Sequence, residues 1–189
     1  MMVIPIGIVA VALTQVVPAQ NAERRGQTAA VATREKQKIS YKAPAANTKY
    51  TQQHLIEIDD VPGHQIRVFE LQRTYPGTNP AETPIFNGVH AKDSWSRAMS
   101  DYVDANGRVF GYVTYDLENG EKVFARYEGI SQTSPGSTTS TPIILTLTGG
   151  TGNFKDIRGT LRVLNVASFS GGRATPAGTQ YEGEYWFEK

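Results

Sequence analysis

The chain has 189 residues and a formal net charge of +1, with 39% hydrophobic and 20% charged residues. This composition is that of a globular domain with an ordinary core, and it excludes collagen, a coiled coil and a multi-span membrane protein. Cysteine is absent, which excludes disulfides, thiolate metal sites and cysteine nucleophiles, so stability must come from packing.

The N-terminal segment is apolar and uncharged. Residues 3–13 form a hydrophobic run, and Val17, Pro18 and Ala19 follow as a signal-peptide cleavage pattern. The run is shorter than the ~20 residues that a membrane-spanning helix needs. We therefore expect residues 1–19 to be a signal peptide and the mature chain to be periplasmic or secreted, without an integral membrane span. A buried N-terminal helix or strand is the alternative.

Residues 20–50 are basic and poor in large apolar side chains, with seven Lys or Arg against two acids. Too little surface would be buried here to offset the entropy lost by ordering the chain. We interpret this stretch as a disordered basic linker ahead of a β-barrel domain at residues 51–189. That domain carries twelve basic and sixteen acidic residues, and an acidic balance disfavours nucleic acid as a partner.

Beyond residue 50, apolar and polar residues alternate and turn dipeptides interrupt them, which is typical of an all-β sandwich or barrel. Eight strands are predicted, and eight strands can close a barrel with room for side chains or one small ligand. The predicted fold class is therefore an all-β, eight-stranded antiparallel β-barrel. The predicted strands are residues 55–58, 66–71, 97–103, 108–117, 122–128, 143–148, 160–166 and 180–187.

Two Asn-Gly pairs, Asn106-Gly107 and Asn119-Gly120, set the predicted register of the central strands. Taken as two-residue type I′ turns, they pair Tyr102 with Gly111 and Tyr115 with Phe124. This register places small residues and aromatic rings together on one face. We expect this face to point inward, because the small residues leave space that the rings border. The face carries Ala98, Ser100, Tyr102, Gly111, Val113, Tyr115, Leu117, Phe124, Arg126 and Glu128.

The opposite face of the same strands is not cleanly polar. It carries Phe110, Tyr112, Val123 and Tyr127, and an exposed apolar patch of this kind commonly marks a subunit contact. Either the protein forms a homodimer or homotrimer, or the two faces are reversed.

The last strand alternates aromatic and acidic residues. Tyr181, Tyr185 and Phe187 occupy one face, while glutamates occupy the other. We expect the aromatic face to point into the barrel.

A glycine-rich turn joins the sixth and seventh predicted strands. It runs Gly-Gly-Thr-Gly-Asn-Phe over residues 149–154, with Arg158-Gly159 downstream. It lacks the Gly-Lys-Ser/Thr ending of a phosphate-binding loop, and no helical pattern follows it. The glycines are expected to permit a tight left-handed connection, with Phe154 tucked under one end of the barrel.

These residues resemble the corresponding turn of the allene oxide cyclase and dirigent-like proteins, a calycin-type β-barrel family. The resemblance covers residues 143–166, with weaker likeness over 97–129, and suggests an exported bacterial member. It implies a barrel with a hydrophobic lumen, often dimeric or trimeric, that acts on or holds a small apolar molecule. In this family cyclases close a ring on a fatty-acid epoxide, dirigent proteins orient phenoxy radicals, and neither chemistry needs a metal or cofactor. No family catalytic residue can be matched to a position of this chain.

Two charged residues share the predicted inner face, Arg126 and Glu128. A charge inside a barrel must find a partner or shift its pKa, so Glu128 and Arg126 are candidate catalytic residues or a polar anchor for an apolar ligand. The alternative is that they pair with each other at a rim. The predicted ligand-binding residues are Tyr102, Tyr115, Phe124, Arg126, Glu128, Tyr181, Tyr185 and Phe187.

The sequence thus predicts an exported β-barrel that binds a small hydrophobic molecule in its lumen. The alternatives are a cofactor-free cyclase or isomerase, a dirigent-like stereochemical guide of the same fold, and a structural envelope protein with a packed barrel. His54, His64 and His90 show none of the spacings used by metal sites, so neither a metal nor a cofactor is expected.

Overall fold

The computed structural model describes residues 35–133, 138–170 and 173–188. The predicted signal peptide and the beginning of the predicted linker lie outside these residues. The described part of the chain contains no helix whose length and hydropathy would let it cross a membrane.

The described residues form ten β-strands and two single turns of 3-10 helix. The strands are β1 (Gln37–Pro44), β2 (Thr48–Glu57), β3 (His64–Thr74), β4 (Ile85–Phe86), β5 (Val89–Val103), β6 (Asn106–Leu117), β7 (Lys122–Thr133), β8 (Thr139–Gly150), β9 (Ile157–Ser170) and β10 (Arg173–Phe187). The turns are η1 (Ala45–Asn47) and η2 (Gly152–Phe154).

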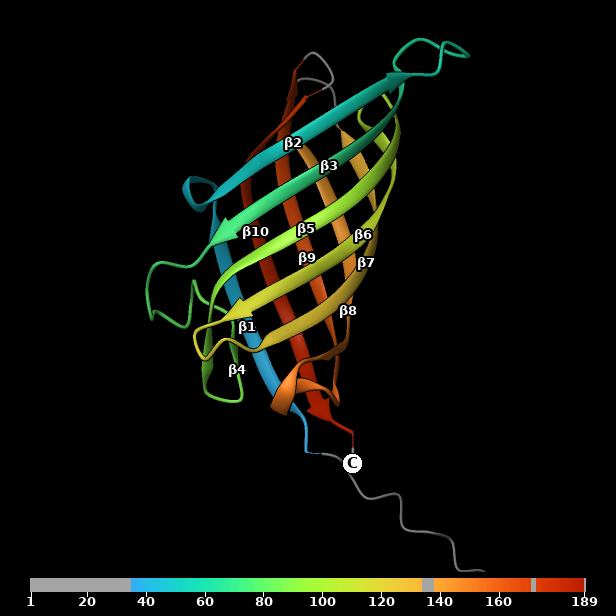
Figure 1. Ribbon diagram of the computed structural model, residues 1–189. Helices are drawn as coiled ribbons and strands as arrows, with labels where there is room; N and C mark the ends of the chain where they lie inside the picture. The colour runs from blue at the N-terminus through green and yellow to red at the C-terminus, as the bar shows by residue number, and fades with distance from the viewer. Residues whose placement is uncertain (1–34, 134–137, 171–172, 189) are drawn as a thin grey trace, which may run out of the picture. The chain divides into compact units, whose positions relative to one another are not determined.

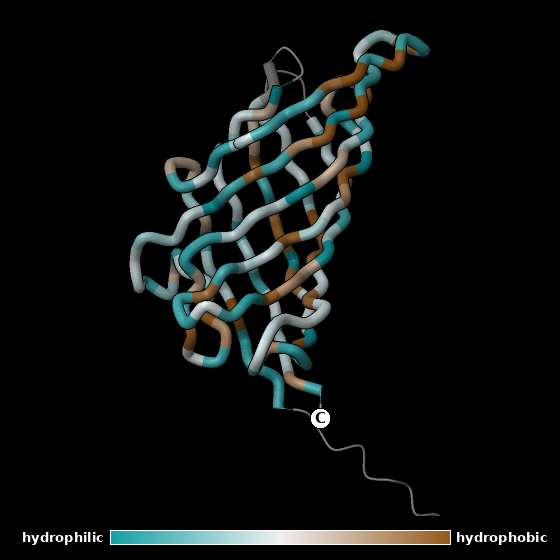
Figure 2. The backbone as a smooth tube through the Cα atoms, viewed as in Figure 1, coloured by the Kyte–Doolittle hydropathy of each residue, from teal (hydrophilic) through white to brown (hydrophobic). Residues whose placement is uncertain are grey.

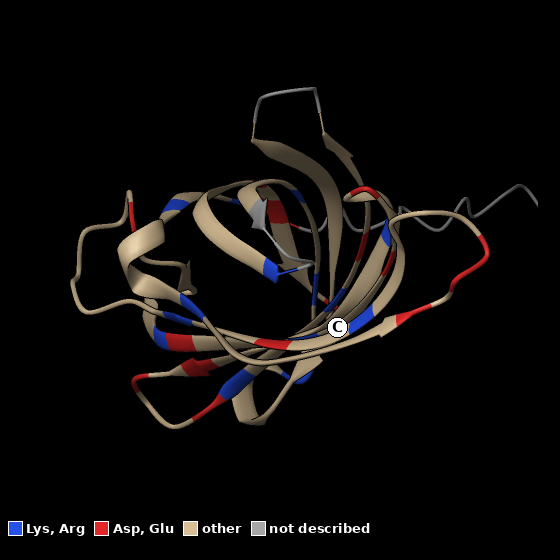
Figure 3. Ribbon diagram, turned by 90° about the horizontal axis from the view of Figure 1, so that it is seen from above, with Lys and Arg blue, Asp and Glu red and all other residues tan. Residues whose placement is uncertain are grey.

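The strands belong to one antiparallel sheet in the order β1-β10-β9-β8-β7-β6-β5-β3-β2, with β4 paired only to β5. The sheet curls, so that β2, β3 and β5 lie in front of β8, β9 and β10 in the view of Figure 1. Seen from above, the strands curl around a shared interior, with acidic and basic residues spread over them (Figure 3). The all-β antiparallel class is confirmed.

The prediction of a closed eight-stranded barrel is wrong. The sheet has ten strands, and within the described residues no backbone ladder joins its two edge strands, β1 and β2. It is an open half-barrel, although its edges are consecutive in sequence and only η1 separates them. The short β4 could not be predicted as a separate strand because it pairs through two residue pairs alone.

Strand β1 lies within the stretch that we predicted to be a linker, so the boundary at residue 51 needs correction. Ile39, Tyr41 and Ala43 alternate with exposed residues and pack into the interior, where Tyr41 is 2% exposed. Lys38 and Lys42 occupy the outer face of this edge strand. The basic composition of the surrounding residues masked the short period-two pattern, and pairing with β10 supplies the burial that offsets the ordering entropy.

The turn between β5 and β6 differs from the predicted one but leaves the faces unchanged. Asp104 and Ala105, both with positive φ, form its centre, and Val103 pairs with Asn106. The partner of Tyr102 is therefore Gly107 rather than Gly111. Because the shift is an even number of residues, every side chain of the two strands keeps its predicted side.

The turn between β6 and β7 shifts the register by one residue, which reverses the faces of β7. The Leu117 N–H donates to the Glu121 carbonyl at 2.9 Å, and Gly120 N–H donates to the Leu117 carbonyl at 3.0 Å. With Gly120 at φ 84°, this is a three-residue loop, a type I turn followed by a left-handed glycine. Tyr115 consequently pairs with Val123, and not with Phe124 as predicted.

The core fills the concave side of the sheet, and Figure 2 shows hydrophobic and hydrophilic residues interspersed along the strands. The larger of two hydrophobic clusters joins side chains of β1 and of β5–β10, and the smaller one joins β3, β5 and β6. Phe154 is buried at the end of the sheet where η2 lies, as predicted from the glycine-rich turn. Gly152 has φ 53°, a left-handed conformation that glycine adopts without strain, so this tight connection favours glycine.

Candidate functional site

The structure brings together the predicted aromatic residues except Phe124, but not the predicted polar anchor. Tyr102, Tyr115, Tyr181 and Tyr185 are buried in the interior, and Phe187 is half-buried against the larger cluster. Tyr41 stacks on Tyr181 with ring centroids 4.3 Å apart, and its hydroxyl lies 3.0 Å from that of Tyr115. These contacts fix the rings in place.

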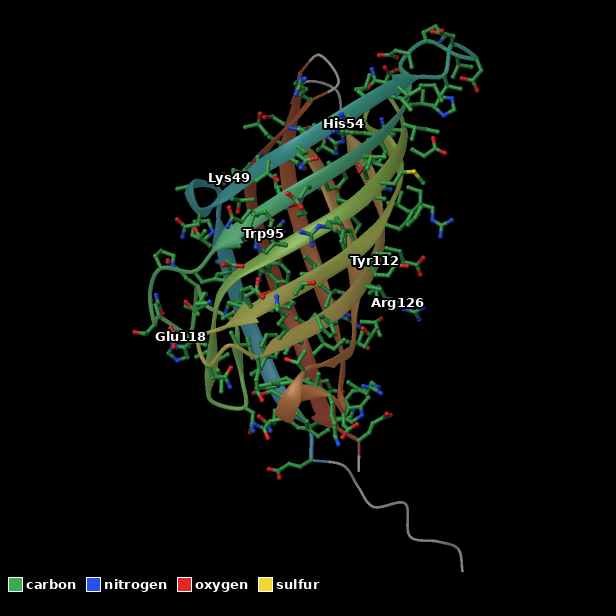
Figure 4. All side chains as sticks on the ribbon, viewed as in Figure 1. Lys49, His54, Trp95, Tyr112, Glu118 and Arg126 are labelled. Carbon is green, nitrogen blue, oxygen red and sulfur yellow. The ribbon has the colours of Figure 1, made fainter. Side chains whose placement is uncertain are left out.

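Arg126 and Glu128 do not face the interior, and their predicted inward orientation is wrong. The register of β7 turns Phe124, Arg126 and Glu128 to the outer side, and Figure 4 shows Arg126 pointing away from the sheet. Glu128 makes an ion pair with Arg108 at 3.4 Å, in which both side chains are exposed. An exposed pair of this kind contributes little to stability.

The interior contains a cavity of about 50 Å³ bordered by residues of eight strands. Rings and aliphatic side chains form most of its wall, and hydroxyl, amide and guanidinium groups form the rest. Its lining includes Tyr50, Arg67, Phe69, Arg73, Tyr127 and Tyr181. The volume suits a few waters or a small polar group, and it is below the 300–1,000 Å³ of a typical ligand pocket.

Arg67 and Arg73 are the functional candidates that sequence reasoning missed. They are 4% and 6% exposed, and they are the only charged side chains among the buried residues of the described chain. Both lie on the inner face of β3 with Phe69 and Leu71. The period-two pattern of residues 66–71 could have predicted an inward Arg67, because it places Arg67 on the same face as Phe69.

Arg73 has hydrogen-bond partners but no acid. Its Nη2 donates to Thr179 Oγ1 at 3.2 Å and reaches Asn165 Oδ1 at 3.5 Å, and its guanidinium lies 5.9 Å from the Tyr181 ring. Its buried Nε has no hydrogen-bond partner among the described residues. None of the ion pairs within the described chain includes Arg73.

Arg67 lies among rings next to the seam, by which we mean the line where β2 meets the first residues of β10 without a backbone ladder. Its guanidinium is 4.7 Å from the Phe69 ring and 5.4 Å from the Tyr50 ring. Its Nη1 donates to Gln53 Oε1 at 3.2 Å. That same oxygen accepts from Ala174 N–H at 3.2 Å, and Gln53 Nε2 donates to the Ala174 carbonyl at 3.4 Å. One amide therefore links the two sides of the seam.

The interior is electropositive at neutral pH. Burial raises the pKa of Tyr181 and of Tyr127, so these phenols are neutral hydrogen-bonding groups. Burial of the Arg73 guanidinium acts to lower its pKa, whereas the nearby Tyr181 and Tyr75 act to raise it once their hydroxyls ionise, far above neutral pH. Arg73 thus keeps its charge.

A second hollow of about 880 Å³ lies on the outer face of the sheet. Ile130, Ile144 and Leu164 are exposed there. Charged residues of both signs accompany them, namely Arg108, Glu128, Arg162 and Glu182. Tyr112 is a neighbouring outward ring that is 70% exposed, and Figure 4 labels it on this side of the sheet.

The histidines take no part in either hollow. His64 Nδ1 lies 2.5 Å from an Asp60 oxygen and its Nε2 lies 2.8 Å from an Asp101 oxygen, which ties the β2–β3 turn to β5. His90 Nδ1 is 3.9 Å from Glu118 Oε2. Within the described residues no group of three or more His, Cys, Asp or Glu side chains is placed to hold a metal ion.

Comparison with family models, with curated proteins and with solved structures found no match.

Proposed function

We propose that this protein binds a small hydrophobic molecule in the interior of its curled sheet. The observation that supports the proposal is a cavity whose wall is mostly rings and aliphatic side chains and which two buried arginines reach. An interior built only for stability has no use for two charged side chains, because apolar residues of the same size stabilise a core better.

A ligand larger than the 50 Å³ cavity enters by widening the seam. Between β2 and the first part of β10, the hydrogen bonds come from the side-chain amide of Gln53. Moving these two strands apart therefore breaks no ladder of backbone hydrogen bonds. The resemblance of residues 149–154 to allene oxide cyclase and dirigent-like proteins favours the same assignment, and we place the mature protein in a periplasm or outside the cell.

We favour binding over catalysis. The buried polar residues of the described chain are serines, threonines and the two arginines, with neutral tyrosines beside them. Neither a carboxylate nor a histidine is among them to act as general acid or base near neutral pH. A cyclase or isomerase of this fold would have to use a tyrosine hydroxyl polarised by Arg73.

Ligand binding is tested by thermal unfolding and intrinsic fluorescence with a panel of fatty acids and phenolics. A ligand at one hundred times its Kd stabilises the folded state by about 2.7 kcal/mol, which is a readily measured rise in Tm. If no compound shifts Tm or quenches the fluorescence, the protein is instead a structural one with a packed interior.

We further propose that the hollow on the outer face of the sheet binds the same hollow of a second copy of this chain, so that the protein forms a homodimer. Its apolar floor carries Ile130, Ile144 and Leu164, and its charged residues include two arginines and two glutamates. A two-fold arrangement places the arginines of one copy against the glutamates of the other. Analytical ultracentrifugation of Leu164→Glu should show a monomer, while Ile56→Glu, at an exposed position on β2, leaves the dimer intact. A monomeric wild type would refute the pairing.

A further inference from the structure

We propose that the ligand carries a carboxylate, and that Arg73 binds this group inside the sheet. This inference rests on the proposed function and narrows it to one class of ligand, an apolar monocarboxylic acid. Buried charges in proteins are paired, because a solvated ion leaves water only where another charge or several hydrogen bonds replace the solvent. Arg73 is 6% exposed, yet the described chain supplies it with no carboxylate.

The surroundings of Arg73 leave part of its hydrogen-bonding capacity unused. Its Nη2 donates to neutral oxygens of Thr179 and Asn165 at 3.2 and 3.5 Å, and its Nε donates to nothing in the described chain. Thr179 Oγ1 itself donates to Asn165 Oδ1 at 2.8 Å, so these two residues already satisfy each other. A carboxylate that accepts from Nε and an Nη of the same guanidinium would complete a bidentate pair.

The second arginine makes the preference for an anion stronger. Arg67 borders the same cavity from the same face of β3, and its positive charge disfavours an ammonium group. Neutral alcohols would satisfy the tyrosine hydroxyls but would leave the Arg73 charge without a counter-charge. A cavity of about 50 Å³ accepts a head group of three heavy atoms, while phosphate esters are bulkier and carry a larger charge.

The apolar part of the ligand has a path away from Arg73. Tyr50 and Phe69 meet edge to face at the cavity wall with ring centroids 5.4 Å apart, and Tyr50 is on β2, next to the seam. An alkyl or aryl tail can therefore lie against these rings while the carboxylate stays beside Arg73.

The test compares three probes with the same ten-carbon chain, namely decanoate, decanol and decylamine, by titration calorimetry on the purified chain at pH 7.5. We expect decanoate to bind at least tenfold more tightly than decanol, and decylamine to bind least. In Arg73→Gln the preference for decanoate over decanol should disappear, while decanol binds as before. Arg97→Gln, which alters an outward arginine paired with Glu70, should behave as wild type.

The outcomes separate the two proposals. If no probe binds, the proposed function fails; if decanol binds as tightly as decanoate in the wild type, the function stands and the carboxylate inference is overturned. The wild-type comparison needs no variant, so it remains decisive if Arg73→Gln does not fold. Unchanged decanoate preference in folded Arg73→Gln would also overturn the inference.

Discussion

Replacing Arg73 by methionine should stabilise the ligand-free protein. Methionine has nearly the length of the arginine stem and no charge to desolvate. The change removes two hydrogen bonds to neutral groups, those to Thr179 and Asn165, and each such bond contributes about 1 kcal/mol. Thr179 and Asn165 keep the hydrogen bond that joins them at 2.8 Å, so neither side chain loses all its partners.

The opposing effect is larger. An ion buried in a protein costs several kcal/mol in desolvation after relaxation, and replacement of buried ionic groups by apolar ones often stabilises by 1–4 kcal/mol. We expect Arg73→Met to raise the free energy of unfolding by about 1–3 kcal/mol. For a folded unit of ~150 residues this corresponds to a rise in Tm of roughly 2–12 °C.

The assay is urea unfolding at pH 7 in a buffer without carboxylic acids, followed by tryptophan fluorescence. Arg97→Met is the matched control, because that arginine is 61% exposed and pairs with Glu70, and its change should stay within about 1 kcal/mol. A loss of more than about 2 kcal/mol in Arg73→Met would refute the reasoning, because it would mean that groups of the protein already compensate the charge.

Three further predictions concern other parts of the sheet. Hydrogen bonds that the His64 ring donates to Asp101 and then to Asp60 raise the pKa of His64 from its ordinary value of 6.5. The resulting stabilisation is complete below that value and is lost as pH rises through the folded pKa. Histidine NMR should give a midpoint above 6.5 that falls in Asp101→Asn. Gln53→Ala should speed hydrogen exchange of the backbone amides in the first part of β10 and leave exchange in the β5–β6 hairpin unchanged. If the variant and the wild type exchange at equal rates in β10, contacts other than those of Gln53 keep the seam closed. Phe154→Ala should lower the unfolding free energy by about 3–5 kcal/mol in urea titrations; a loss below 1 kcal/mol would contradict its role in closing the core.

Most of the strands and the inner positions of Tyr102, Tyr115, Tyr181 and Tyr185 were predictable from the sequence, because alternation depends only on which residues are apolar. The side of each ring on β6 was correct even though the β5–β6 turn was misplaced, since an even shift leaves the faces unchanged. The side chains of β7 were not predictable in the same way. Asn119-Gly120 suits both a two-residue type I′ turn and the end of a three-residue loop, and these differ by one residue.

The buried arginines were missed for a different reason. Charged residues in strands usually face solvent, so Arg67 and Arg73 were not assigned to the interior although Phe69 and Leu71 share their face. Strand β1 was not predicted, because its apolar residues are few and alternate with lysines. Both errors follow from using average composition where the local alternation was the better guide.

The most direct test of an electropositive interior is the pKa of a bound carboxylic acid. Decanoic acid labelled with carbon-13 at its carboxyl group can be titrated by NMR in the complex. Two buried arginines should lower the pKa of the bound acid below that of the free acid, because they stabilise the carboxylate. A pKa raised above the free value would show an acid held neutral in an apolar cavity, and would contradict the account.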